Sequence, residues 1–146
     1  MIETNSIIST IATIDNSANK LIVEELKKHN LDGLAPSHGS ILVVLYNNEQ
    51  GVPMSKITHE INKDKSTVTA LVNKLEKMEL LEKLKNTDDS RSTLVRLTKK
   101  GLDTKYIVID VISTKLLDLT YKGFTEEEKE LVCNLLERIK NNFLEK

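Results

Sequence analysis

NKDKSTVTALVNKLEKMELLEKLKNTDDSRSTLVRLTKKG, residues 62–101, is the stretch that decides the fold of this chain. The apolar residues of its first half recur three and four apart and form one stripe: Val68, Leu71, Val72 and Leu75. This spacing predicts an amphipathic helix, whose start Asp64 or Ser66 can cap. The second half holds two short extended stretches, 80–85 and 93–97, around the polar loop NTDDS, which predicts a β-hairpin.

The residues before this stretch predict three more helices. Apolar positions recur at helical spacing from Ile7 and stop before HNLDG, and a second helix starts at Pro36 and closes at Gly51. A short helix at about 55–62, capped by Ser55, then leads through the tight link NKD into the next helix. A short helix, a tight turn and a second helix make a helix-turn-helix, and the hairpin after it makes a winged helix.

After the hairpin, Thr98 can cap a long helix that runs to about residue 123. Its segment YIVIDVI, residues 106–112, is apolar nearly all the way round and could also be a buried strand. We interpret it as helix because the apolar pattern continues without a turn signal. A helix of this kind needs cover on several sides, for which a second copy of the chain is the obvious source. A last helix begins with a capping box from Thr125 to Glu128.

The composition limits the class of protein. A chain of 146 residues with a net charge of −1 is one domain without a global field toward nucleic acid or acidic membranes. Residues 53–100 nevertheless carry a net charge of +4 and the remainder −5, which indicates an acidic partner for the middle only. The single cysteine, Cys133, cannot form an internal disulfide and fits a reducing cytosol. We expect no secretory signal and no membrane span.

The outward face of the predicted helix 65–77 suits a DNA major groove. Opposite the apolar stripe stand Ser66, Ala70, Asn73 and Lys77, flanked by Thr67, Thr69 and Lys74. Small hydroxyls, an amide and lysines, with no acid between 66 and 75, are the groups that contact base edges and phosphates. The simpler alternative is an ordinary solvated helix face. The helix-turn-helix context favours the DNA-binding interpretation.

The hairpin adds a second contact. Arg91 lies near its tip, where a long cation can reach the adjacent minor groove, and Asp89 can accept hydrogen bonds from the guanidinium and hold it in place. The alternative is a solvated ion pair, worth about 0–1 kcal/mol.

With these residues in view, the chain closely resembles the MarR family of winged-helix transcriptional regulators. The resemblance covers nearly the whole chain and includes the wing motif Asp-x-Arg followed by a strand and Leu-Thr-x-x-Gly, here Asp89, Arg91, Leu97, Thr98 and Gly101. Two positions depart from the family: Glu79 stands where a glycine is common after the recognition helix, and Lys83 where an arginine is frequent.

The expected fold is mainly α with a small β-hairpin wing. The resemblance implies dimerisation helices at residues 1–34 and 101–146 around a winged helix-turn-helix lobe at 35–100. It also implies a cytoplasmic homodimer on double-stranded DNA, acting as a repressor and released by a small-molecule effector. The expected DNA-binding residues are Lys65, Ser66, Thr67, Thr69, Asn73, Lys74, Lys77 and Arg91, with Asp89 supporting the wing.

Other functions find less support in the sequence. No catalytic motif is present, so we expect no enzyme, no cofactor and no membrane partner. The rival hypothesis is a winged helix used only for protein contacts, which would show apolar residues on the outer face. Cys133 could sense oxidants, and His38 with Glu24 could contribute to a zinc site, but we favour an incidental thiol and no metal. Tyr106 and His38 could line an effector pocket, but Tyr106 is more simply expected in the core and His38 at a helix cap, with His59 in solvent.

Overall fold

In the computed structural model, residues 3–88 and 92–145 are described, and they fall into two compact units, 1–114 and 115–146. The first unit begins with a short 3-10 turn, η1, and continues with a long helix and three shorter ones: η1 (Thr4–Ser6), α1 (Ile7–Lys28), α2 (Pro36–Tyr46), α3 (Met54–Ile61) and α4 (Lys65–Lys77). The predicted helices are therefore confirmed, including α4 with its cap at Asp64, which accepts the Thr67 N–H.

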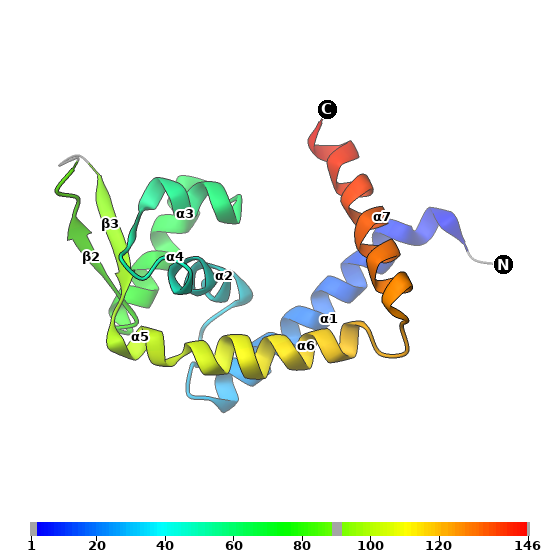
Figure 1. Cartoon of the computed structure of the whole chain (residues 1–146), viewed down its shortest axis with the longest axis horizontal. Helices are drawn as coiled ribbons and strands as arrows, with labels where there is room; N and C mark the ends of the chain where they lie inside the picture. Colours follow the sequence, from blue (N-terminus) through cyan, green and yellow to red (C-terminus); the bar gives the residue numbers. More distant parts are fainter. Residues whose placement is uncertain (1–2, 89–91, 146) are drawn as a thin grey trace. The chain divides into compact units, whose positions relative to one another are not determined.

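A small antiparallel sheet completes the lobe (Figure 1). Its strands are β1 (Val52–Pro53), β2 (Leu81–Lys85) and β3 (Thr93–Leu97), in the order β1-β3-β2. The β2–β3 hairpin confirms the prediction, and it pairs Leu81 with Leu97 and Lys85 with Thr93. The sequence does not predict the two-residue β1, because its pairing of Val52 with Val95 joins positions far apart in the chain.

The core of the first unit is aliphatic. Its fully buried side chains come from every layer of the lobe: Leu26, Ile41, Leu42, Leu45, Ile57, Val68, Val72, Leu75, Leu80, Leu81 and Val95. Three of the four residues in the predicted apolar stripe of α4 are among them, and the fourth, Leu71, packs against the cluster. Burial of this stripe fixes which face of α4 points outward.

The segment after the hairpin is helical, as predicted, but it is not one regular helix. Thr98 caps α5 (Lys99–Asp103), a π-helical stretch η2 (Tyr106–Ser113) follows, and α6 (Thr114–Thr120) comes next. The Ser113 hydroxyl donates to the Val108 carbonyl five residues back, in keeping with the wider turn. Tyr106 is 68 % exposed, so its predicted place in the core is wrong for the single chain.

The second unit carries α7 (Glu126–Leu144). Its start is the predicted capping box: the Glu128 N–H donates to Thr125 Oγ1 at 3.1 Å, and the Thr125 N–H donates to Glu128 Oε1 at 2.9 Å. The predicted cap of α3 at Ser55 is wrong, because α3 begins at Met54 and Pro53 stands at the cap position. Within residues 3–88 and 92–145, no helix is long and apolar enough to cross a membrane.

Candidate nucleic-acid interface

A groove of about 680 Å³ runs along the outer side of α4, between α3 and the hairpin. Most of the residues that line it carry an ammonium, hydroxyl or imidazole group, and one is a methionine: Met54, Ser55, Thr58, His59, Lys65, Thr69, Lys83, Ser92 and Thr93. No acidic side chain belongs to this described lining. A concave surface with cations and small hydrogen-bonding groups suits a polyanion that also presents base edges.

The start of α4 is organised by the Asp64 carboxylate. It accepts the Thr67 N–H at 2.8 Å, the Ser66 hydroxyl at 2.8 Å and the Thr67 hydroxyl at 3.0 Å. These hydrogen bonds, led by the Thr67 N–H, lower the pKa of Asp64 to about 2. Because both hydroxyl hydrogens are directed at Asp64, the oxygens of Ser66 and Thr67 face other partners as acceptors.

The middle of the outer face carries Thr69 and Asn73. Thr69 lines the groove, and its hydroxyl donates to the Lys65 carbonyl at 2.8 Å. Asn73 is exposed, and its Oδ1 accepts a hydrogen bond from Lys83 Nζ on β2. Lys83 Nζ also lies 3.6 Å from Glu76 Oε1, so the hairpin and α4 are joined by polar contacts beside the groove.

The remaining predicted cations are placed differently. Lys74 Nζ donates to the Gly33 carbonyl in the turn between α1 and α2, which directs this side chain away from the groove lining. Lys77 is exposed at the last turn of α4. The predicted wing-tip residues Arg91 and Asp89 lie outside the described residues.

The turn after α4 joins this helix to the start of α5. Glu79 adopts a left-handed backbone, with φ 64°, at the position where the family commonly has glycine. Thr98 donates from its N–H to the Leu80 carbonyl at 3.1 Å and from its hydroxyl to the Glu79 carbonyl at 2.6 Å. Gly101 N–H donates back to Thr98 Oγ1 at 3.0 Å. The Leu-Thr-x-x-Gly segment therefore holds the end of α4.

Besides Met54, three polar residues of α3 belong to the groove but are absent from the predicted set. Ser55 and His59 lie on the side of α3 opposite its buried Ile57, Thr58 lies beside them, and His59 is exposed, as predicted. Their spacing of three and four residues is a usable signal, since it puts them on one helix face. What the sequence lacks is any indication that this face turns toward α4.

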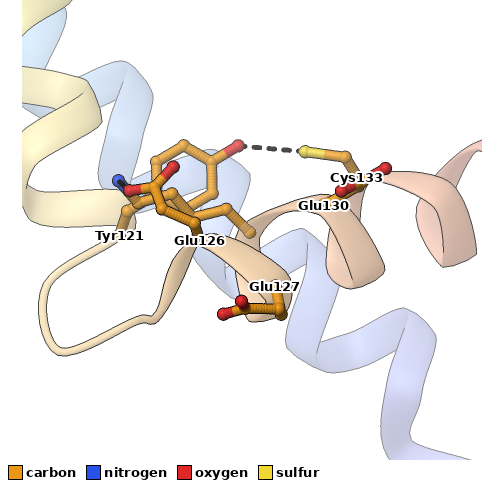
Figure 2. Close-up of a pocket in the computed structure, with 6 residues that line it drawn as sticks. Tyr121, Glu126, Glu127, Glu130 and Cys133 are labelled. Carbon is orange, nitrogen blue, oxygen red and sulfur yellow. Dashed lines mark hydrogen bonds and ion pairs between the residues drawn. The ribbon is translucent and has the colours of Figure 1, made fainter.

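The cysteine lies in a separate pocket of about 440 Å³ within the second unit (Figure 2). Cys133 is exposed, and its Sγ is 3.1 Å from the Tyr121 hydroxyl, a contact that is the main reason that the pKa of Tyr121 is raised. Reactive cysteines lie in electropositive surroundings. Here the lining holds three carboxylates and one ammonium group, which favours an unreactive thiol: Glu126, Glu127, Glu130 and Lys129.

His38 supports the start of α2, as predicted. Its Nδ1 accepts a hydrogen bond from the Ala35 N–H at 2.8 Å. The pKa of His38 is lowered, mainly by burial of the imidazole and to a lesser extent by the nearby charge of Lys74. Over residues 3–88 and 92–145, no three or more His, Cys, Asp or Glu side chains gather as a metal site would require. His38 is thus part of the fold of the lobe.

Helix α3, helix α4 and the hairpin together define a winged helix-turn-helix protein. The MarR family model matches residues 34–93. The HTH-type transcriptional regulator BilQ of Clostridioides difficile is 30% identical to this chain over 101 residues, which cover 68% of this chain and 68% of BilQ. The HTH-type transcriptional regulator SarZ of Staphylococcus haemolyticus is 28% identical over 119 residues, covering 81% of this chain and 76% of SarZ. The chain belongs to the MarR family, and its function is transcriptional regulation.

Solved structures share the fold over almost the full length. A MarR protein from Peptoclostridium difficile superimposes with a TM-score of 0.83 at 23% identity, covering 98% of this chain and 92% of the other. A mutant MarR from E. coli, complexed with operator DNA, gives a TM-score of 0.80 at 18% identity, covering 94% of this chain and 99% of the other. The relatives that the chain matches are transcriptional regulators and not enzymes.

Proposed function

We propose that this chain is a cytoplasmic homodimeric repressor that binds a pseudo-palindromic DNA operator. The observation that carries the proposal is the groove beside α4, whose described lining has two lysines, several hydroxyls and no acid. The fold relative from E. coli was solved with operator DNA, which supports the same partner here. In this proposal α4 enters the major groove and the hairpin tip reaches the minor groove.

The proposed base and phosphate contacts follow the outer face of α4. The set is Lys65, Ser66, Thr67, Thr69, Asn73, Lys74 and Lys77, with Arg91 at the wing and Asp89 as its support. To these we add His59 and Lys83, because both line the groove. Lys74 must leave the Gly33 carbonyl to reach a phosphate, so its contribution is expected to be smaller than that of Lys65.

Two unpartnered apolar faces support a homodimer. Helix α7 has no buried residue over its 19 positions. Its large apolar side chains are each more than 40% exposed, among them Leu131, Leu135, Leu136 and Phe143. On α1, Ile7, Ile8 and Ile14 are exposed in the same way. Soluble chains rarely leave such faces uncovered, and two-fold pairing of identical chains is the commonest cover. The proposed dimerisation helices therefore lie at residues 1–34 and 101–146.

A dimer would place two α4 helices on one duplex, roughly 34–36 Å apart. A small-molecule effector that changed this spacing would lower operator occupancy, because both half-sites could no longer be bound together. The effector is proposed from the family resemblance.

Selection of bound duplexes from a random DNA pool, with the solution mass recorded, tests the proposal. We expect an inverted repeat bound by a dimer. With the selected operator and an unrelated duplex as probes, Arg91→Ala should weaken binding to both. Asn73→Ala should reduce the preference for the operator more than it reduces non-specific affinity. A folded dimer that enriches no sequence, with and without added effector candidates, would contradict the proposal and favour a protein-binding role.

A further inference from the structure

The contact between β2 and the middle of α4 fixes the orientation of one side-chain amide. Lys83 Nζ donates to Asn73 Oδ1, and an ammonium group can only donate. The oxygen of Asn73 must therefore face Lys83, and its NH₂ group faces away from the lysine. Two hydrogen-bond donors, the Asn73 NH₂ and the Lys83 ammonium, then flank the amide oxygen at an exposed point of the proposed recognition helix.

We propose that Lys83 and Asn73 act as a pair that selects guanine at the operator position they meet, an inference that rests on the proposed function. Guanine presents two acceptors, N7 and O6, to the major groove. Adenine presents one acceptor and one donor, and the usual bidentate contact of asparagine with adenine uses the amide oxygen as acceptor. In this chain one lone pair of that oxygen accepts from Lys83, so the pair presents more donors than acceptors to the base, which matches guanine better than adenine.

Glu76 explains why the lysine is needed. It is the one acidic residue in α4, three residues after Asn73, and its Oε1 lies 3.6 Å from Lys83 Nζ. Residues three apart are neighbours on a helix surface, so without Lys83 the Asn73 NH₂ could turn to the Glu76 carboxylate. That rotation would free the amide oxygen and favour adenine. Lys83 is thus a specificity-determining residue that acts through Asn73 as well as on the base.

The main test is duplex selection with Lys83→Met, Lys83→Arg and Lys85→Met. Lys85 is the matched control, because it is exposed on the same side of the same strand and its loss removes the same charge. We expect the wild type and Lys83→Arg to enrich guanine at one position of each half-site. Lys83→Met should lose that preference by about tenfold or more. Lys85→Met, at a residue outside the proposed contact set, should keep the preference and change at most the salt dependence of binding, because it removes only a charge.

If Lys83→Met keeps the guanine preference and behaves like Lys85→Met, Lys83 is a phosphate-binding cation only and the inference is overturned. Enrichment of adenine at this position by the wild type would overturn it equally.

A second measurement separates this inference from the proposed function. The side-chain amide resonances of Asn73 in the DNA-free protein, identified by their loss in Asn73→Asp, should shift in Lys83→Met and stay in place in Lys85→Met. Unchanged resonances in Lys83→Met would refute the contact itself, whatever the DNA results. The Asn73 resonances could shift in Lys83→Met while the wild-type protein enriches no DNA sequence. This result would refute the proposed function and the guanine assignment, while the contact would stand.

Discussion

Gly101→Ala should severely destabilise the winged lobe, because the start of α5 passes very close to the turn after α4. A Cβ at this position would lie 1.8 Å from the Leu80 carbonyl oxygen and 2.8 Å from its carbonyl carbon. Ordinary contact begins at 3.4 Å, so one of the two backbones must move by roughly 1.5 Å. No side-chain rotation can relieve this overlap, since both atoms belong to the backbone.

The magnitude follows from what the movement breaks. The Thr98 N–H and hydroxyl donate to the Leu80 and Glu79 carbonyls at 3.1 and 2.6 Å, and a typical hydrogen bond contributes about 1 kcal/mol. Overpacking adds about 1–3 kcal/mol. We therefore expect a loss of about 3–5 kcal/mol in the free energy of unfolding, a large share of the roughly 5–15 kcal/mol typical of a domain.

Urea unfolding followed by circular dichroism measures this loss, at one fixed protein concentration because association shifts the apparent stability. Gly39→Ala is the matched control: Gly39 lies inside α2, and a Cβ there meets nothing within 4 Å. The control should gain up to about 1 kcal/mol, since glycine is costly in a helix interior. A Gly101→Ala protein within about 1 kcal/mol of the wild type would refute the close approach of the two backbones.

Three further predictions concern the same lobe. Glu79→Gly should stabilise it by about 0.5–1 kcal/mol, because glycine adopts the left-handed φ of 64° without steric cost; an unchanged urea midpoint would show that Glu79 is unstrained. The low pKa of Asp64 means that its contribution is complete above pH 3.8 and disappears as the pH falls through about 2. Asp64→Asn, which still caps a helix, should lack this part of the acid sensitivity, and parallel curves of unfolding midpoint against pH for the two proteins would contradict it. Tyr46→Phe should cost about 1 kcal/mol in urea unfolding, since the buried Tyr46 hydroxyl lies 2.6 Å from Thr104 Oγ1, and no loss would mean that this hydrogen bond contributes nothing net.

The parts of the fold that the sequence predicts well are those set by local chemistry. The caps at Asp64, Thr98 and Thr125 and the alternating hairpin strands depend on residues within a few positions of one another. Ser55 shows the limit of this reasoning: a serine at the expected start of a helix predicts a cap, whereas the helix has already begun at Met54.

The parts that the sequence does not predict depend on packing between distant segments. β1 exists because Val52 finds a partner in Val95, and no pattern around residue 52 indicates this. An even distribution of apolar residues in 106–112 cannot show which side of the helix is covered within one chain, so the prediction for Tyr106 is wrong. In the candidate site, periodicity alone predicts the outer face of α4. It cannot predict the Lys83–Asn73 contact, because that contact joins two elements.

The order of the sheet has a consequence for the solubility of the lobe. Its central strand, β3, is paired on both sides, which leaves the outer edges of β1 and β2 as the positions where a foreign strand could add. β1 is only two residues long and ends in Pro53, which has no N–H to donate. β2 exposes Lys83 and Lys85, whose charges oppose pairing with another chain. Both outer edges of the sheet therefore disfavour edge-to-edge pairing between separate copies of the chain.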